Sequence, residues 1–592
     1  MIENLARLWS ISLIDQLHKC GISHFYLSPG MRNAPLISAL KNLQQEGRDI
    51  QVHLGIDERA MSYRALGYAK ASGKIPALIC TSGTALANYT PAVVEAYKSG
   101  NGMLIISADR PSELVMGDAN QTIVQNDFYG KFSCCSFSFE VSALLPKYKA
   151  ALRALPFAID QIKKRHFSAH INIGFSEPLD GSACDIPSDM RELFYQTFLR
   201  PHAYCHMPQS SSASSNAVDK VLEELISKYN NPLIVIGDLP FYSPKHAVLE
   251  TLQFLSRQQI PFILDVTCGV KYQFTLQDGL IPAFDHPEVI KQFELRPPDV
   301  IIHLGGRMTS KHYYQYLQNG PELDLYSVSD THLLCDPTLS SQCHLDLNPI
   351  VFLKLLLEKC QQAISQKGYI FNPQNAHQRA DFFSFIKKKR ELIDNAPLTF
   401  PFVSKTIVEY SPDQTCLFLG NSTAIRSFDS YASIDSTSQL QVISNRGAAG
   451  IEGHLACAIG SQDDQSSSDR GRTVLVYGDV SALYDLNSFM LLSQLQTPMT
   501  IVIINNQCGG IFNLLPLKDM QQELELMTTP HSINFEHIAQ AFSINYLRVN
   551  AKDEFIQAYK SSFLSTKHLL LEVCINDPEN VELYKQLKTV RL

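Results

Sequence analysis

An acidic residue and a pair of amides close two apolar segments near the end of the chain. Asp479 follows the segment TVLVYG, Asn505 and Asn506 close the next one, TIVII, and 24 residues lie between Val480 and Asn505. If both segments are parallel strands, their carboxyl ends meet at one edge of a sheet, where open α/β folds bind ligands. Carboxylate, amide and backbone carbonyl oxygens are hard ligands suited to Mg²⁺, which completes its octahedron with phosphate oxygens and water. This spacing therefore indicates a magnesium and phosphate site, although a strand-end aspartate can also be purely structural.

A second acidic residue stands at the start of a helix-like segment far upstream. Glu58 precedes the segment 61–71, and Gly83 in TSGTA lies just after an apolar run. A glutamate at a helix start can simply complement the positive end of the helix dipole. It can also act as a general acid or base on a bound ligand. The residue alone leaves both interpretations open.

Short apolar runs alternate with helical patterns along most of the chain, and these are the elements that must position the polar residues. Continuous apolar strands between helices are typical of parallel sheets covered on both faces, whereas buried helices would need longer runs. The runs that we expect to be strands are 23–27, 77–80, 103–107, 233–236, 300–304, 417–419, 473–476 and 500–504.

Two polar stretches divide the chain. Residues 209–217 (QSSSASSNA) are serine-rich, and 366–378 are polar with a glycine and a proline. A chain of 592 residues exceeds a single core. We therefore expect three α/β domains, each a doubly wound parallel sheet, at 1–208, 209–370 and 371–592.

Composition narrows the class of protein. Apolar residues make up 45% and charged residues 18% of the chain, and the net charge is −8, which favours a compact protein over a disordered one. No basic cluster indicates binding to nucleic acid or to a membrane surface. No apolar window is long enough for a membrane span, and no export signal is evident, so we expect a cytoplasmic protein. The 14 cysteines include no CxxC pair, which favours free thiols over disulfides or zinc.

Several longer motifs resemble one family of enzymes. GDV followed by NN is similar to the GDG…NN signature of thiamine-diphosphate-dependent enzymes, with Val480 in place of the third glycine. Within that class, the first and last domains, and one short segment of the central domain, resemble the 2-succinyl-5-enolpyruvyl-6-hydroxy-3-cyclohexene-1-carboxylate synthase family. The matching segments are 28–36 (SPGMRNAPL), 57–59 (DER), 107–111 (SADRP), 119–121 (ANQ), 304–311 (LGGRMTSK), 420–426 (GNSTAIR), 444–453 (SNRGAAGIEG), 478–487 (GDVSALYDLN) and 505–516 (NNQCGGIFNLLP).

The resemblance implies thiamine diphosphate and Mg²⁺ as cofactors. It implies that Glu58 bonds the pyrimidine ring and promotes loss of the C2 proton of the thiazolium, and that Ile451 supports the bent cofactor, although Ile451 also suits an ordinary core position. It further implies that the metal ligands are Asp479, Asn506 and the backbone carbonyl of Cys508. Ser481, in the same motif, is expected at the cofactor.

The reaction implied by the resemblance decarboxylates 2-oxoglutarate and adds the succinyl unit to isochorismate, a step of menaquinone biosynthesis. Such a site needs several cations, because an unpaired, desolvated carboxylate is costly. We expect Ser422, Arg426 and Arg446 to hold the succinyl carboxylate and Gln121 to orient substrate near C2. The expected contacts of isochorismate are Arg32, Arg110 and Lys311.

The resemblance also implies sites between subunits of a homodimer or homotetramer. Four positions depart from the family pattern, namely Met31, His312, Glu452 and Cys508. Two alternatives stay open: a thiamine-diphosphate enzyme using other oxo acids, similar to acetohydroxyacid synthase, and a catalytically silent scaffold. Five cations argue against pyruvate as substrate, and the intact Glu58, Asp479 and Asn506 argue against a silent protein.

Overall fold

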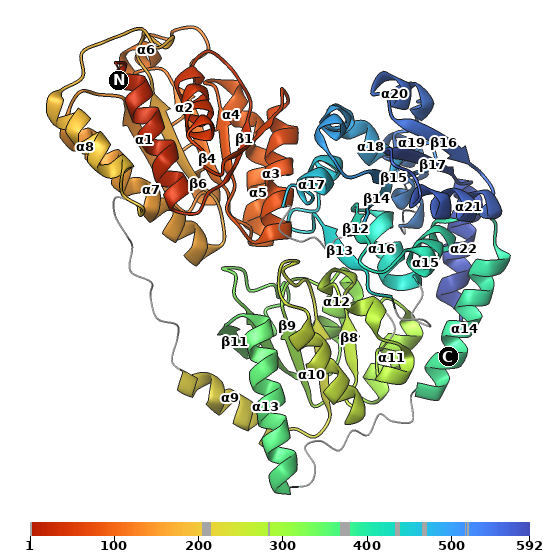
Figure 1. The fold of residues 1–592 in the computed structure, drawn as a ribbon. Coiled ribbons are helices and arrows are strands. Elements are labelled where there is room, and N and C mark those ends of the chain that lie inside the picture. The colour runs from red at the N-terminus through yellow and green to blue at the C-terminus, as the bar shows by residue number, and fades with distance from the viewer. Residues whose placement is uncertain are drawn as a thin grey trace.

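Three parallel sheets, each covered by helices on both faces, make up the protein (Figure 1). The computed structural model describes residues 3–203, 215–281, 284–367, 379–432, 438–464, 471–515, 517 and 520–592. The sheets confirm the predicted α/β class with three doubly wound domains. The domain limits stay a prediction, because 208–209, 370–371 and most of the two predicted linkers lie outside the described residues.

The first domain contains a six-stranded sheet whose inner strands are apolar and buried. The strands are, in spatial order, β2 (Gln51–Leu54), β1 (His24–Leu27), β3 (Ala77–Cys80), β4 (Leu104–Asp109), β6 (Ala169–Gly174) and β5 (Ser136–Glu140). The helices are α1 (Leu5–Lys19), α2 (Ala34–Gln45), α3 (Glu58–Ser72), α4 (Thr84–Asn88), α5 (Thr90–Ser99), α6 (Ser112–Met116), α7 (Leu145–Arg165) and α8 (Ser188–Phe198).

The central domain contains a five-stranded parallel sheet. Its strands are, in spatial order, β11 (Cys343–Asp346), β10 (Asp324–Ser329), β9 (Val300–Leu304), β7 (Pro232–Ile236) and β8 (Phe262–Leu264). Its helices are α9 (Ser215–Lys228), α10 (His246–Arg257), α11 (Pro287–Leu295), α12 (Lys311–Asn319) and α13 (Pro349–Lys367).

The last domain repeats the strand order of the first. Its strands are β13 (Gln441–Ser444), β12 (Cys416–Leu419), β14 (Thr473–Gly478), β15 (Met499–Asn505), β17 (Leu569–Cys574) and β16 (Asn545–Val549). Its helices are α14 (Arg379–Asn395), α15 (Phe400–Tyr410), α16 (Thr423–Tyr431), α17 (His454–Gly460), α18 (Asp479–Tyr484), α19 (Gln521–Thr528), α20 (Phe535–Ala541), α21 (Lys552–Ser562) and α22 (Asp577–Thr589).

All three sheets reverse their strand order at the same place. Counted within each domain, the second strand pairs with the first, the first with the third, and the third with the fourth. The connections therefore leave opposite sides of the sheet between its first and third strands, and such switch points are where α/β sheets bind ligands. In the last domain the switch point lies between β12 and β14.

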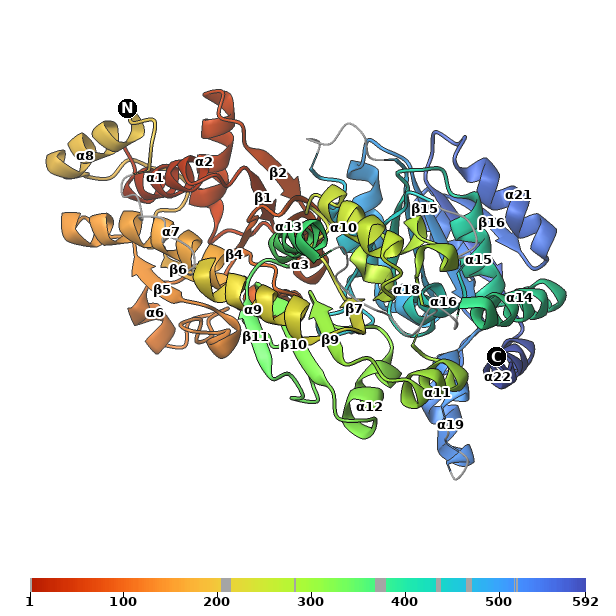
Figure 2. The same ribbon diagram turned by 90° about the horizontal axis from the view of Figure 1, so that it is seen from below.

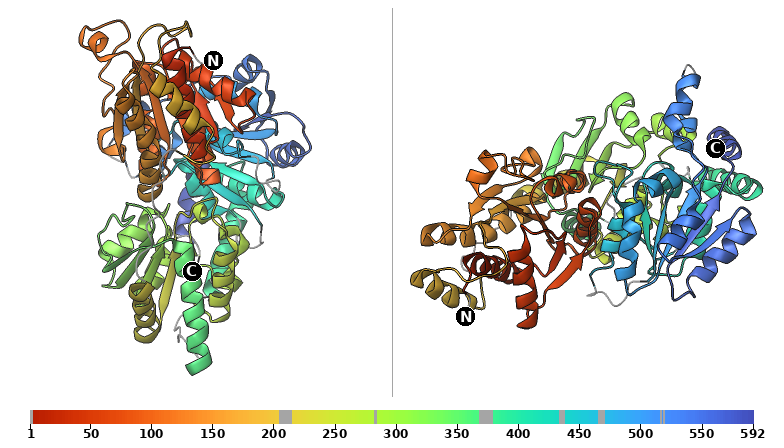
Figure 3. Two further views of the ribbon diagram at one scale, coloured as in Figure 1. Left: turned by 60° about the vertical axis from the view of Figure 1, so that its left-hand side comes forward. Right: turned by 90° about the horizontal axis from the view of Figure 1, so that it is seen from above.

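One hydrophobic core joins the first and last domains, because α3 packs directly against α17. The approach requires glycine: a Cβ added to Gly67 would overlap the backbone of Cys457, and one added to Gly460 would overlap that of Arg64. The central domain lies below the other two, and Figures 2 and 3 show this arrangement from other directions. Among the described residues, no helix is both long and apolar enough to cross a bilayer.

Candidate active site

Asp479 lies at the carboxyl edge of the last sheet, where β14 ends and α18 begins. Its side chain is 2% exposed, and Oδ1 accepts the N–H of Val480 at 2.7 Å. The other carboxylate oxygen, Oδ2, is buried with no hydrogen-bond partner, although His531 Nε2 lies 3.3 Å away. Burial raises the pKa of this carboxyl to about 6. Ser481, two residues further on, is also buried at the start of α18.

Asn506 follows the neighbouring strand, β15. Its amide is bonded by Asp577, a residue that the sequence analysis did not select. Its Nδ2 donates to Asp577 Oδ1 at 2.6 Å, and Asn513 Nδ2 donates to the other oxygen of the same carboxylate, also at 2.6 Å. The amide nitrogen of Asn506 is thus engaged, and its oxygen stays available for a cation. Asp577 follows β17, which pairs with β15, so the strand-end rule that found Asp479 could also have found it.

The donors at this edge fit magnesium. The described residues include no group of three or more His, Cys, Asp or Glu side chains able to hold a metal. A metal here would therefore combine Asp479 with amide and backbone oxygens and with oxygens of the ligand, as Mg²⁺ does. The open space beside Gly478, next to the buried Asp479 carboxylate, agrees with such a ligand.

Cys508 stands close to this edge with its thiol protonated. Burial, together with the negative charges of Asp577 and Asp479, raises the pKa of the thiol to about 11. A protonated thiol is a poor ligand for a hard cation. The backbone carbonyl of Cys508 accepts the N–H of Gly510 at 2.9 Å and retains a second lone pair.

Two arginines lie beside the switch point of the last sheet. Arg426, on α16, donates from Nη1 to the carbonyl of Ser422 at 2.6 Å, and Ser422 itself has a left-handed backbone with φ of 65°. Burial and the nearby charge of Arg446 lower the pKa of the Arg426 guanidinium. In the part of the chain that the structure describes, no carboxylate forms an ion pair with either arginine. Two like charges held together without a counter-ion create a site for an anion.

Asn421, which the sequence reasoning did not select, organises the loop that carries one of these arginines. Its Nδ2 donates to the carbonyls of Asn445 and Gly450, each at 2.7 Å, and its Oδ1 accepts Arg446 Nη1 at 3.2 Å. The same loop presents Ile451, whose side chain is 37% exposed. In the single chain Ile451 is therefore not enclosed in the core of its domain, and an exposed isoleucine on a fixed loop can support an apolar ring.

Glu58 begins α3 at the carboxyl edge of the first sheet. Asp57 caps the helix by accepting the N–H of Ala60 at 3.1 Å, so Glu58 is free of the capping role. Glu58 Oε2 instead accepts a hydrogen bond from Asn88 Nδ2 at 3.1 Å.

Arg110 and Gln121 meet at the ends of β3 and β4. Arg110 Nη1 donates to Ser82 Oγ at 2.6 Å and to the backbone carbonyl of Gln121 at 2.9 Å. Gln121 Nε2 donates to the carbonyl of Ser82 at 3.0 Å, and its backbone is left-handed with φ of 62°. A Cβ at Gly83 would come within 3.0 Å of the Gln121 side chain, so this position needs a small residue. The structure thus brings these predicted residues together.

Arg32 joins the same edge from the end of β1. Its Nη1 donates to the carbonyl of Phe175 at 2.8 Å, and Nη2 lies 3.4 Å from the exposed carboxylate of Glu177. Burial and the charge of Arg110 lower the pKa of Arg32. Met31, the departure beside it, is exposed.

Lys311 lies apart from these two arginines. It is exposed at the start of α12 in the central domain, and its neighbour His312 is within electrostatic range of Asp285 and of Lys588 on α22. Within one chain Lys311 therefore lies closer to the last domain than to the first. No contact between the described residues links it to Arg32 or Arg110.

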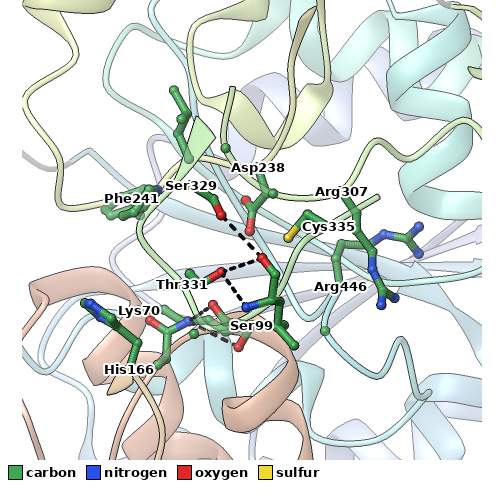
Figure 4. A pocket seen from close by; sticks show the side chains of 18 of the residues that line it. Lys70, Ser99, His166, Asp238, Phe241, Arg307, Ser329, Thr331, Cys335 and Arg446 are labelled. Atoms are coloured by element: carbon green, nitrogen blue, oxygen red, sulfur yellow. Dashed lines mark hydrogen bonds between the residues drawn. The ribbon is translucent and has the colours of Figure 1, made fainter. Parts of the chain in front are cut away.

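A cavity of about 100 Å³ lies where the three domains meet. Figure 4 shows Arg307 and Arg446 on one side of it and Lys70 and His166 on the other, with Asp238 between them. Its lining contains neither Asp479 nor Glu58, so it adjoins the candidate site through Arg446 without being the catalytic cleft.

The fold and the site define a thiamine-diphosphate-dependent enzyme. Residues 10–129 match the thiamine pyrophosphate enzyme N-terminal TPP binding domain, and 427–573 match the C-terminal TPP binding domain. A solved structure, the Rhodococcus jostii RHA1 thiamine diphosphate-dependent 4-hydroxybenzoylformate decarboxylase, aligns with a TM-score of 0.68 at 17% identity, over 96% of this chain and 99% of that one. At this level of identity the comparison shows that the two proteins share a fold.

Sequence relatives narrow the class to one family. The chain is 35% identical to the 2-succinyl-5-enolpyruvyl-6-hydroxy-3-cyclohexene-1-carboxylate synthase of Syntrophus aciditrophicus, over 100% of this chain and 99% of the relative. It is 30% identical to the enzyme of that name from Chlorobium phaeovibrioides, over 99% and 97% respectively. The chain belongs to the 2-succinyl-5-enolpyruvyl-6-hydroxy-3-cyclohexene-1-carboxylate synthase family, which confirms the resemblance found in its motifs.

Proposed function

We propose that this chain is an active transferase that decarboxylates 2-oxoglutarate and adds the succinyl unit to isochorismate in a 1,4 fashion. The product is 2-succinyl-5-enolpyruvyl-6-hydroxy-3-cyclohexene-1-carboxylate, an intermediate of menaquinone biosynthesis. Family membership supports the reaction. One observation supports 2-oxoglutarate as the donor substrate. Arg426 and Arg446 are neighbouring guanidinium groups beside the sheet edge that holds Asp479, and neither has a carboxylate partner among the described residues.

The cofactors we propose are thiamine diphosphate and Mg²⁺. Asp479, the amide oxygen of Asn506 and the carbonyl of Cys508 would hold the metal, and Ser481 would lie against the diphosphate. Ile451 would support the thiazolium ring. Bound in this way, the cofactor supplies a nucleophilic carbon and an acceptor for the electron pair released on decarboxylation. Glu58 would hold the proton shared with the pyrimidine ring and so control when that carbon becomes reactive.

Substrate recognition would be divided between the two outer domains. Ser422, Arg426 and Arg446 would hold the distal carboxylate of 2-oxoglutarate, because guanidinium groups bind carboxylates with charge-assisted hydrogen bonds. Gln121 would orient the substrate over the reactive carbon. The carboxylates of isochorismate would meet Arg32 and Arg110, with Lys311 approaching from the central domain.

A homodimer would complete the site. Both edges that carry site residues also expose large apolar side chains, which in a soluble monomer is unfavourable. These residues are Met31, Ile56, Met116 and Val124 in the first domain and Ile451, Tyr484 and Ile533 in the last. We propose that each site combines Glu58 of one subunit with the magnesium edge of another, in a homodimer or in a homotetramer built from two such dimers.

The test is incubation of the purified protein with thiamine diphosphate, Mg²⁺ and 2-oxoglutarate, with and without isochorismate. We expect the protein to release carbon dioxide from 2-oxoglutarate, and to release it faster when isochorismate is present. The ultraviolet absorbance of isochorismate should fall at the same time. Faster release from pyruvate than from 2-oxoglutarate would instead indicate an enzyme similar to acetohydroxyacid synthase. Failure to bind the cofactor in calorimetry would indicate a catalytically silent scaffold.

A further inference from the structure

We propose that Lys70 and Glu95 of the first domain are positioning residues that fix the loop 445–453 of the last domain in its working shape. This loop joins β13 to α17 and carries Arg446 and Ile451. The inference rests on the roles proposed above for those two residues. Lys70 lies on α3 and Glu95 on α5, so the fixing groups come from a different domain of the same chain.

Lys70 donates three hydrogen bonds, two of them to residues at the start of the loop and one to Glu95. Nζ donates to the carbonyl of Ser444 at 2.8 Å, to Asn445 Oδ1 at 2.9 Å and to Glu95 Oε1 at 3.0 Å. The side chain is 7% exposed. Although burial disfavours its charge, the Glu95 carboxylate raises the pKa of Lys70, so the ammonium stays charged.

Glu95 binds the backbone of the loop directly. Oε1 accepts the N–H of Gly447 at 3.0 Å, and Oε2 accepts the N–H of Ala448 at 2.6 Å. The carboxylate is 2% exposed. The loop also approaches α5 so closely that a Cβ on Gly447 would lie 2.7 Å from the carbonyl oxygen of Glu95. These two N–H groups directly follow Arg446, and the groups bonded by Lys70 directly precede it, so the chain is fixed on both sides of this arginine.

A buried ion pair is an expensive way to stabilise a fold, because an apolar pair of similar size is often as stable. Unlike an apolar pair, the ion pair forms directional hydrogen bonds to the loop. Each charged group bonds a particular N–H or C=O of the loop, and a displaced loop would leave a buried charge unpaired. Lys70, Gly447 and Arg446 all line the cavity in Figure 4, so on that side the loop faces open space and is not held by packed side chains. The pair therefore favours one loop conformation over alternatives.

The direct test is hydrogen–deuterium exchange of the intact protein, loaded with thiamine diphosphate and Mg²⁺. Glu95→Gln keeps the size of the side chain but can accept only one of the two N–H bonds. We expect peptides covering 445–453 to exchange about ten-fold faster in this variant, the scale of one lost bond to a charged group. The matched control is Asp15→Asn, which breaks a buried ion pair to Lys19 on α1, away from the loop. Unchanged exchange of 445–453 in Glu95→Gln, or equal acceleration in the control, would overturn the proposal.

The second test asks whether Glu95 acts through Arg446. In the wild-type background, Glu95→Gln should raise KM for 2-oxoglutarate about ten-fold, with a smaller change in kcat. In an Arg446→Ala background the same substitution should change KM less than about two-fold, because the group that it positions is gone. Equal effects in both backgrounds, or a lowered Tm with an unchanged KM, would make the pair merely structural. If the wild type does not use 2-oxoglutarate, the proposed function fails, while the exchange experiment still decides the positioning role.

Discussion

Asn506 Nδ2 donates to Asp577 Oδ1 at 2.6 Å, joining the end of β15 to the start of α22. An amide can present either its nitrogen or its oxygen to a neighbour. The Asp577 carboxylate binds the nitrogen, which leaves the amide oxygen for the metal site proposed above. Partners of this kind orient metal ligands and are worth about 10–100-fold in metal affinity.

Asp577→Ala should raise the Mg²⁺ concentration needed for half-maximal thiamine-diphosphate binding about ten-fold, because Asn506 would then be free to rotate. Calorimetric titration at a series of Mg²⁺ concentrations measures this. The matched control is Glu579→Ala, an exposed acidic residue in the same first turn of α22, which tests the effect of helix charge alone. An identical Mg²⁺ requirement in both variants would show that Asp577 does not orient the ligand.

Glu58→Gln should leave folding and cofactor affinity nearly unchanged but slow deuterium exchange at C2 of thiamine diphosphate by roughly 10²–10⁴-fold. Glutamine keeps the shape of the side chain and can still pair with Asn88, but it cannot share a proton with the pyrimidine ring as a carboxyl group does. Quenched-flow exchange read by NMR measures the rate. Near-normal exchange would remove Glu58 from the mechanism.

Arg426→Ala should lower kcat/KM for 2-oxoglutarate by roughly 10–100-fold, since a hydrogen bond to a charged group contributes about 1.5–3 kcal/mol. Thiamine-diphosphate binding should change little. The discriminating measurement is the ratio of kcat/KM for 2-oxoglutarate to that for pyruvate, which lacks the distal carboxylate. A ratio equal to that of the wild type would mean that this arginine serves the structure only.

His170 should make the first domain sensitive to acid. It lies on β6, fully buried, with Nε2 2.8 Å from Ser107 Oγ and Nδ1 without a partner. Burial lowers its pKa from 6.5 to about 4. Between these two values the unfolded chain binds a proton that the folded chain does not, so the free energy of unfolding falls as the pH falls, by up to about 3 kcal/mol.

The measurement is calorimetric Tm as a function of pH from 7 to 4.5 for wild type and for His170→Asn. The variant starts less stable, but its Tm should fall less steeply with acid, because it lacks this proton uptake. The other buried histidines titrate equally in both proteins. Parallel curves would show that His170 does not contribute to the acid sensitivity.

Much of the fold could be predicted from local sequence. The eight predicted strands are present, with ends shifted by a few residues at most, because each is an apolar run buried on both faces. The edge strands β2, β11 and β16 were not singled out, since their side chains are partly exposed and produce no continuous apolar run. The inner strands β6, β10 and β17 were not singled out either, because buried polar residues such as His170, Ser327 and Glu572 interrupt their apolar runs.

The candidate site divides in the same way. Strand-end spacing pointed to Asp479 and Asn506, whereas Glu58 and the arginines were selected through the resemblance of their motifs to one enzyme family. The tertiary structure decided which residues hold them. Asp577 bonds both Asn506 and Asn513, although it lies 64 residues after Asn513 in the sequence. Lys70 and Glu95 reach the loop 445–453 from another domain. Contacts across such separations depend on how domains pack, which no local pattern of residues records.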